Sequence, residues 1–342
     1  MKPFSWHARE FTELFAGKAA LPHALLLHGQ RGVGKLGFAR ALAQALLCEA
    51  PARDGACGGC TACAWFAADG HPDYRQVEPD AAGADDEGEG AEEEERGARK
   101  KKKSTVIKVD QIRTTTDYIN IGSHRGGPKV IVVHPAETLH LSAANALLKG
   151  LEEPPPRTHF LLVSHRPHQL LPTIKSRCQQ IALHAPDAET ATAWLAAQGV
   201  RDPGLALAHM GHAPLLALEL NGSEYWGARA AFMRQITARD LDVLAAADAI
   251  GDCPIPDVIA WLQKWSYDLV HLHATGRVRY NPDQQDAAAR TAAQTDPLGM
   301  LRFHREMVRL QLIAQHPLQP RLFAEQLLFD YRSAIEPRAR AA

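Results

Sequence analysis

At 342 residues the chain is longer than one hydrophobic core usually serves, so two or three domains are expected. A net charge of −1, with 46% hydrophobic and 23% charged residues, is ordinary for a globular protein and argues against tight nucleic-acid binding through charge alone. The N-terminal sequence MKPFSWHAREF lacks the apolar run of a signal peptide, and no run of about 18 apolar residues follows, which predicts a cytoplasmic protein.

The first elements expected along the chain are a short helix, a buried strand and a glycine-rich loop. Residues 6–15 have the pattern of an amphipathic helix, and the apolar run 24–27 is typical of a buried strand. The segment GQRGVGKL at 29–36 then matches the motif GxxxxGK[ST] except at its last position. In this motif, backbone N–H groups and the lysine contact phosphates. The candidate nucleotide-binding residues are Gly29, Gly32, Gly34 and Lys35.

The last position of the motif departs from the pattern, because Leu36 replaces the Ser or Thr whose hydroxyl ligates Mg²⁺. Phosphoryl transfer depends on positioning and charge neutralisation, so a loop without this ligand is not expected to turn over ATP. Two interpretations remain open. The loop binds a nucleotide without cleaving it, or it serves only as a scaffolding turn that needs glycines.

Four of the six cysteines cluster after a helix expected from Gly34 to about Cys48. Thiolates at this spacing can close a tetrahedral site around Zn²⁺, and a structural ion needs no open coordination position. We predict a structural zinc site in preference to reduced cysteine pairs or a redox CxxC motif. The predicted ligands are Cys48, Cys57, Cys60 and Cys63.

Residues 80–103 form a low-complexity segment in which acidic residues between 85 and 95 precede basic residues between 96 and 103. Such charge blocks cannot bury apolar surface, which predicts disorder. The alternative interpretation is a basic patch at 99–103 that faces DNA.

Two apolar runs farther along predict the centre of a parallel sheet. The runs 129–133 and 160–163 flank a helical pattern that includes Leu147 and Leu151. A strand, a helix and a strand in this order imply a right-handed parallel crossover. A further strand is expected at 104–109, before this unit.

The end of the first of these strands lacks the acidic pair that binds the magnesium shell and orients the attacking water in P-loop ATPases. His134 and Pro135 stand there instead. A neutral imidazole cannot replace a carboxylate around Mg²⁺, because this hard ion prefers oxygen ligands. A second magnesium-handling position is therefore missing, independently of Leu36.

Three short sequence motifs in this region occur together in one family. They are NALLK at 145–149, LEEPP at 151–155 and Ser176-Arg177-Cys178. With them the chain resembles the clamp-loader AAA+ family of bacterial DNA replication. The resemblance implies that Arg177 reaches the nucleotide of a neighbouring subunit as an arginine finger supplied in trans, and that the chain helps to load a sliding clamp onto primed DNA.

The remainder of the chain is predicted to be helical. The expected helices are 187–198, 203–209 and 214–220, then 225–239, 256–274, 284–293, 297–315 and 318–335. The resemblance implies α/β plus all-α architecture in three domains. These are an AAA+ P-loop domain with a parallel sheet and a zinc-binding insertion at 1–183, a small helical lid at 184–220, and a helical collar at 221–342.

The lid carries a third departure from ATPases of the family. Hydrolysing relatives have an arginine at the start of the third lid helix, whereas the segment 211–215 reads GHAPL. The resemblance therefore implies a subunit without turnover of its own, within the DNA polymerase III holoenzyme, which is a nucleotidyltransferase complex. The implied partners are tau/gamma-type ATPase subunits, a delta-type subunit, the sliding clamp, the polymerase core and primed DNA, in a hetero-oligomer that is pentameric in the family.

Three rival interpretations remain. The first is a catalytically active tau/gamma-type ATPase, which Leu36 and His134 disfavour. The second is a P-loop phosphotransferase that acts alone, and it would need a magnesium ligand and an acceptor site. The third is a zinc-dependent nucleic-acid-binding module at 48–63, a segment whose charge is nearly neutral.

Overall fold

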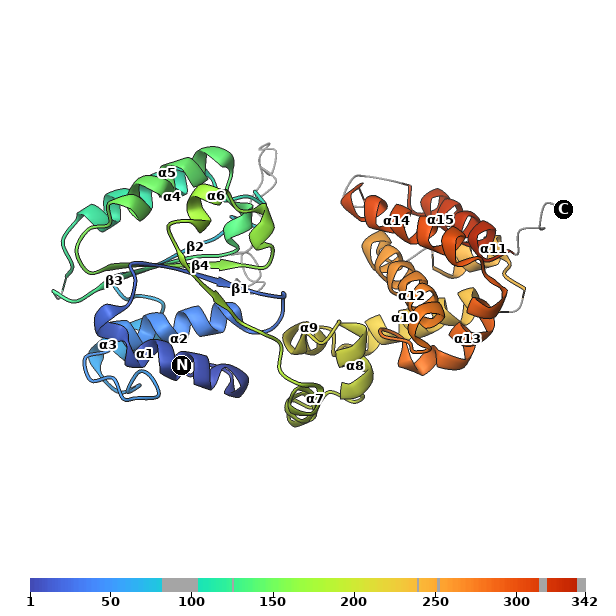
Figure 1. Ribbon diagram of the computed structural model, residues 1–342, viewed down its shortest axis with the longest axis horizontal. Coiled ribbons are helices and arrows are strands. Elements are labelled where there is room, and N and C mark those ends of the chain that lie inside the picture. Colours follow the sequence, from blue (N-terminus) through green and yellow to red (C-terminus); the bar gives the residue numbers. More distant parts are fainter. Residues whose placement is uncertain (82–103, 125, 239, 251–252, 314–318, 337–342) are drawn as a thin grey trace, which may run out of the picture. The chain divides into compact units, whose positions relative to one another are not determined.

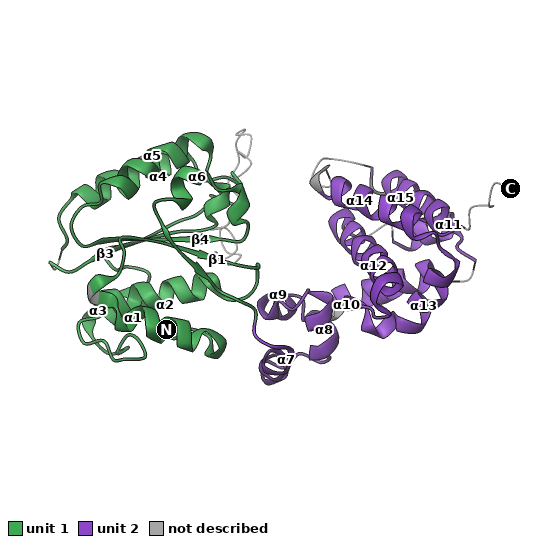
Figure 2. Cartoon of the chain, viewed as in Figure 1, with its two compact units in different colours: residues 1–185 green, residues 186–342 purple. Residues whose placement is uncertain are grey.

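The computed structural model describes residues 1–81, 104–124, 126–238, 240–250, 253–313 and 319–336 (Figure 1). The charged segment predicted to be disordered falls on 82–103 apart from its first two residues, and so lies outside the described residues. The chain divides into two compact units, unit 1 at 1–185 and unit 2 at 186–342 (Figure 2).

Unit 1 is built on a five-stranded sheet in the order β2-β3-β4-β1-β5, in which every pair of neighbouring strands is parallel. The strands are β1 (Ala24–His28), β2 (Tyr74–Val77), β3 (Lys129–Val133), β4 (Thr158–Ser164) and β5 (Gln179–Ala182). The crossover predicted from the two apolar runs is confirmed, because β3 and β4 are parallel neighbours that flank a helix.

Helices cover both faces of this sheet (Figure 1). On one face lie α1 (Ala8–Ala16), α2 (Lys35–Leu47) and α3 (Thr61–Ala67), and on the other lie α4 (Val109–Asn120), α5 (Leu141–Glu152) and α6 (Pro172–Lys175). Successive residues of the central strands alternate between the two cores: Leu161 packs towards α2, and Leu162 towards α5. Burial on both faces explains why these strands are continuously apolar.

Three local expectations for unit 1 differ from the structure. The strand predicted at 104–109 is wrong, because only an isolated bridge between Ile107 and Leu139 forms there and α4 already begins at Val109. The side chain of Gln111 accepts the backbone N–H of Lys108 (2.8 Å), which favours this early helix start. Strands β2 and β5 were not predicted, since they lie at the edges of the sheet and carry polar residues.

Unit 2 is entirely helical in its described part, as predicted. Its helices are α7 (Ala188–Ala197), α8 (Pro203–His209), α9 (Pro214–Glu219), α10 (Ser223–Ile236), α11 (Val243–Ala249), α12 (Ile255–Thr275), α13 (Gln285–Gln294), α14 (Pro297–Ile313) and α15 (Pro320–Ile335). The short helix α11 was not predicted. One hydrophobic cluster lies within α7 to α9 and a larger one around Trp261, Trp265 and Tyr331. The division into lid and collar domains stays a prediction.

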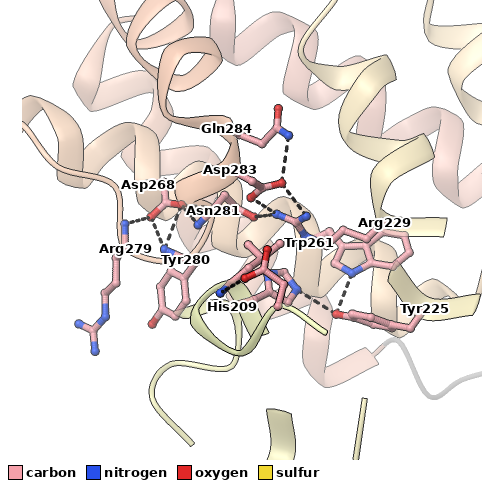
Figure 3. Close-up of polar contacts among 12 residues, drawn as sticks. His209, Tyr225, Arg229, Trp261, Asp268, Arg279, Tyr280, Asn281, Asp283 and Gln284 are labelled. Carbon is pink, nitrogen blue, oxygen red and sulfur yellow. Dashed lines mark hydrogen bonds and ion pairs between the residues drawn. The ribbon is translucent and has the colours of Figure 1, made fainter. Parts of the chain in front are cut away.

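A buried polar network fixes the loop between α12 and α13 (Figure 3). The carboxylate of Asp268, which is fully buried, accepts the backbone N–H groups of 279–281 and the side-chain amide of Asn281. Arg229 donates to both carboxylate oxygens of Asp283 (2.9 and 2.8 Å) and to the side chain of Asn281 (2.8 Å). Charge-assisted bonds of this kind join α10, α12 and the loop into one rigid element.

Five short 3-10 helices complete the described structure, at Ser5–His7, Lys18–Ala20, Ala136–Thr138, Pro167–Gln169 and Pro282–Gln284. Among the described residues, no helix combines the length and the apolar character that crossing a membrane would require.

Candidate functional site

The glycine-rich loop lies at the carboxyl end of β1 and leads into α2. Gly29, Gly32 and Gly34 have φ angles of 148°, 78° and 98°, a region that favours glycine. A Cβ atom at Gly29 would lie 2.2 Å from the backbone oxygen of Leu183, and one at Gly34 would lie 2.5 Å from the ring of Phe4. The loop therefore has the left-handed backbone that a phosphate-binding turn needs, and its shape depends on these glycines.

Lys35 is turned onto its own loop. Its side chain is buried, and its Nζ donates to the backbone oxygen of Gln30 (2.5 Å). Burial lowers the pKa of Lys35 to about 8, although the carboxylate of Glu137 acts in the opposite direction. The indole of Trp6 donates to the backbone oxygen of Val33 (3.0 Å), so the N-terminal segment packs directly against the loop.

Two imidazoles lie at neighbouring strand ends, and one of them, His134, stands where an ATPase carries its acidic pair. The rings of His134, after β3, and His165, after β4, meet edge to face with centroids 5.1 Å apart. Burial lowers the pKa of each to about 4, helped at His134 by His165 and at His165 by Lys35. Glu137 accepts the backbone N–H of His165 (3.0 and 3.2 Å). The pair is therefore neutral at pH 7 and offers no oxygen ligand.

The four cysteines predicted to bind a metal ion come together. Their Sγ atoms all lie within 4.8 Å of one another, and those of Cys48 and Cys60 are 3.8 Å apart. A tetrahedral site with metal–sulfur bonds of about 2.3 Å has edges of about 3.8 Å, so the donor set fits such an ion. Cys48 caps the C-terminus of α2, and Cys60 and Cys63 lie at the start of α3.

The cysteine thiols differ in their ionisation. Burial raises the pKa of Cys63 to about 12 and also raises that of Cys48. Burial acts in the same direction on Cys60, but hydrogen bonds with the backbone of Glu49 and Cys63 outweigh it and lower the pKa to about 6. Since the thiolate is the form that binds a metal ion, the lowered pKa of Cys60 favours its ligand form.

Arg177 follows α6 and lies at the edge of an open hollow of about 560 Å³. Its Nη2 pairs with Glu152 Oε1 (2.5 Å), and its Nη1 donates to the backbone oxygen of Thr173 (2.9 Å). The arginine side chain is 34% exposed, so solvent or another molecule can reach the guanidinium. The hollow is lined by His23, Leu151, Glu152, Ser176 and Arg177.

The sequence of this chain is similar to known proteins over most of its length. A family model described as "DNA polymerase III, delta subunit" matches residues 8–187. The chain is 36% identical over 279 residues to DNA polymerase III subunit delta' of Pseudomonas aeruginosa, covering 80% of this chain and 78% of that protein. The chain belongs to the delta-prime family of DNA polymerase III subunits. The delta-prime subunit of Escherichia coli is 28% identical over 346 residues, covering 98% and 97% of the two chains.

The chain is also similar to the tau subunit of DNA polymerase III from Salmonella typhimurium, with 35% identity over 167 residues. This match covers 49% of the chain and 22% of the tau subunit. The delta-prime family membership makes the chain a clamp-loader subunit of DNA polymerase III, related in sequence to tau.

The structure places the predicted sites of this delta-prime chain in separate parts of unit 1. The glycine-rich loop and the cysteine cluster lie at opposite ends of α2, whose 13 residues span about 20 Å. Glu152, which pairs with Arg177, was not among the predicted site residues, although it lies in the LEEPP motif. His165 was not among them either, and its signal in the sequence is a polar residue directly after a buried strand.

Proposed function

We propose that this delta-prime chain does not turn over ATP itself and supplies Arg177 in trans to the ATP site of a neighbouring tau/gamma-type subunit. The accessible guanidinium of Arg177 carries this proposal. It lies in the Ser-Arg-Cys motif beside an open hollow, and its pair with Glu152 leaves the side chain 34% exposed. An arginine that stabilises transition-state charge contributes about 10³ to 10⁵ to turnover in GTPases.

The glycine-rich loop supports the first half of the proposal. The position of the magnesium-ligating hydroxyl is taken by Leu36, which packs against the core cluster of α2. The strand end that would carry acidic ligands presents His134 beside His165. Without the hydroxyl of the loop and the acidic pair at the strand end, the site lacks the two ligand positions that neutralise charge on a bound nucleotide through Mg²⁺. Nucleotide binding without cleavage, through Gly29, Gly32, Gly34 and Lys35, stays a prediction.

The cysteine cluster is assigned a structural Zn²⁺. Four sulfur donors leave no open coordination position, which is typical of structural and not catalytic zinc. The cluster joins the C-terminus of α2 to the start of α3, a segment otherwise linked by few backbone hydrogen bonds. The ion would therefore fix this connection, about 20 Å from the glycine-rich loop at the other end of α2.

In the proposed assembly this chain acts together with tau/gamma-type ATPases, a delta-type subunit, the sliding clamp and, through the complex, the polymerase core. Its role is to complete a neighbouring active site while the assembly opens the clamp and loads it onto primed DNA. The sequence similarity to tau supports placement beside a related subunit.

The test measures ATP turnover of the reconstituted clamp loader, with clamp and primed DNA, for wild type, Arg177→Ala and an assembly without this chain. We expect Arg177→Ala to assemble normally and to lose turnover about 10³-fold at the site that it serves. Arg113→Ala is the matched control, since Arg113 is an exposed arginine of unit 1 that, among the described residues, pairs with Asp110 in its own helix (3.5 Å). Equal turnover for Arg177→Ala and wild type would overturn the proposal.

A further inference from the structure

Both terminal nitrogens of the Arg177 guanidinium contact residues of its own subunit, although the side chain remains 34% exposed. Nη2 pairs with Glu152, and Nη1 donates to the backbone oxygen of Thr173 and, at 3.4 Å, to the hydroxyl of Ser176. Thr173 lies one turn before Arg177, so the side chain folds back along α6 instead of extending away from the subunit. An arginine finger must extend, and this conformation is retracted.

We propose that Glu152 is a positioning residue that holds Arg177 in this retracted conformation, and that the pair must open before Arg177 engages the neighbour's nucleotide. This inference rests on the proposed function of Arg177. The inference adds a regulatory step to that function. Arg177 stays paired with Glu152 until assembly with clamp and DNA makes its contact with the neighbour's nucleotide more favourable than this pair.

The position of Glu152 strengthens its hold on the arginine. Glu152 is the last residue of α5, where the unpaired carbonyl groups of the helix carry partial negative charge. The guanidinium at this helix end therefore meets the carboxylate and the helix dipole together. Both act in the same direction and favour the retracted conformation.

The same features oppose a bound phosphate. Carboxylate and phosphate oxygens are alternative acceptors for the same guanidinium N–H groups, so they compete for Arg177. A phosphate that approached while Glu152 remained in place would also meet a like charge. Arg177 must therefore break its contact with Glu152 before its N–H groups can bind the phosphate.

The hold is weak enough to be released. The side chains of Arg177 and Glu152 are 34% and 48% exposed, so water screens their attraction. The hollow of about 560 Å³ beside them gives an incoming anion access without movement of the sheet. We call the Arg177–Glu152 pair the latch. An exposed pair of this kind changes the equilibrium between the retracted and extended arginine by only about 1.5- to fivefold, which suits regulation and would not block function.

The experiment compares Glu152→Gln with wild type in the reconstituted clamp loader, with and without clamp and primed DNA. Removal of the charge weakens the latch, so we expect basal turnover without clamp and DNA to rise about 1.5- to fivefold. Stimulated turnover is expected to stay at the wild-type level, because the pair is already open in that state. The ratio of stimulated to basal turnover falls accordingly.

Glu153→Gln is the matched control. It makes the same charge change one residue away, at an exposed position, and the described structure shows no bond from Glu153 to Arg177. Its basal turnover should equal that of wild type. A double variant, Glu152→Gln with Arg177→Ala, should show no rise in basal turnover, because the released group is absent.

Different failures can be told apart. If Arg177→Ala lowers stimulated turnover but Glu152→Gln leaves basal turnover unchanged, the finger stands and the latch is refuted. If Glu152→Gln lowers stimulated turnover in an intact assembly, Glu152 supports the engaged arginine and the latch is again refuted. If Arg177→Ala has no effect on turnover, the proposed function itself fails.

Discussion

The imidazole rings of His134 and His165 meet edge to face, 5.1 Å between centroids, at the ends of the neighbouring strands β3 and β4. The Nδ1 atoms of both rings are buried and reach no partner among the described residues. Two half-buried histidines that are neutral at pH 7 make this site sensitive to acid.

The first prediction concerns this sensitivity. Burial holds the pKa of His134 and of His165 at about 4, below the value of about 6.5 in an unfolded chain. Between pH 6.5 and 4 the unfolded state therefore binds more protons, so stability falls as the pH falls through this window. Each histidine contributes at most about 1.4 kcal/mol per pH unit. Urea unfolding at pH 7, 6 and 5, followed by circular dichroism, measures the loss.

His134→Asn and His165→Asn should each reduce the difference in stability between pH 7 and pH 5, whereas His168→Asn, at an exposed position, should not. A pH dependence that is the same in all three variants would show that other groups cause it.

The second prediction concerns the shape of the glycine-rich loop. Gly29→Ala places a Cβ atom 2.2 Å from the backbone oxygen of Leu183 and adds a side chain at φ 148°. Backbone cannot give way as a side chain can, so we expect a loss of about 1–3 kcal/mol in unfolding free energy. Gly227→Ala is the control, since it lies inside α10 with open space around it and should stabilise by about 0.5–1 kcal/mol. Equal effects of the two substitutions would contradict the clash.

The third prediction concerns the metal. Elemental analysis of purified protein should find zinc at a near-stoichiometric level, and Cys60→Ser should lose it together with thermal stability of unit 1. Cys253→Ser, in unit 2 and outside the cluster, should retain the metal. Because the ion is proposed to be structural, the Cys60→Ser fraction that still folds and assembles should support normal clamp-loader turnover. Wild-type protein without zinc would refute the assignment.

The fourth prediction concerns the network in unit 2. Asp268→Asn keeps the shape of the side chain but removes the charge and points an amide donor at backbone N–H groups of 279–281. Leaving such buried donors without an acceptor should cost about 2–4 kcal/mol. Arg309→Ala, which removes an exposed pair with Glu306 (3.9 Å), should change stability by less than about 0.5 kcal/mol. Thermal unfolding of the two variants, with a signal from unit 2, compares their losses of stability.

The central elements of unit 1 could be predicted because each carries a local signal. The apolar runs of β1, β3 and β4 arise from burial on both faces, and the glycines of 29–34 from the backbone angles of the loop. The edge strands β2 and β5 could not be predicted in this way. Each edge strand pairs with one neighbouring strand, and its other edge has no partner strand in the described part of the sheet. Polar residues such as Gln179 and Gln180 are exposed there and are therefore tolerated.

The partners of the site residues were less predictable than the residues themselves. Arg177 was singled out by its sequence phrase, but its contact with Glu152 depends on how α5 and α6 pack. The pairing of His134 with His165 likewise requires β3 and β4 to be neighbours in register. Such contacts between residues distant in the chain come from tertiary structure and leave no periodicity in the sequence.

The close approach of Gly29 to Leu183 has a meaning for how such motifs are interpreted. The backbone oxygen of Leu183 requires a glycine at position 29 whatever the loop binds, so this glycine alone does not indicate that the subunit cleaves nucleotide. A glycine-rich signature of this kind records the geometry of a turn. Whether the loop belongs to an active ATPase has to be judged from the residues around the turn, here Leu36 and His134.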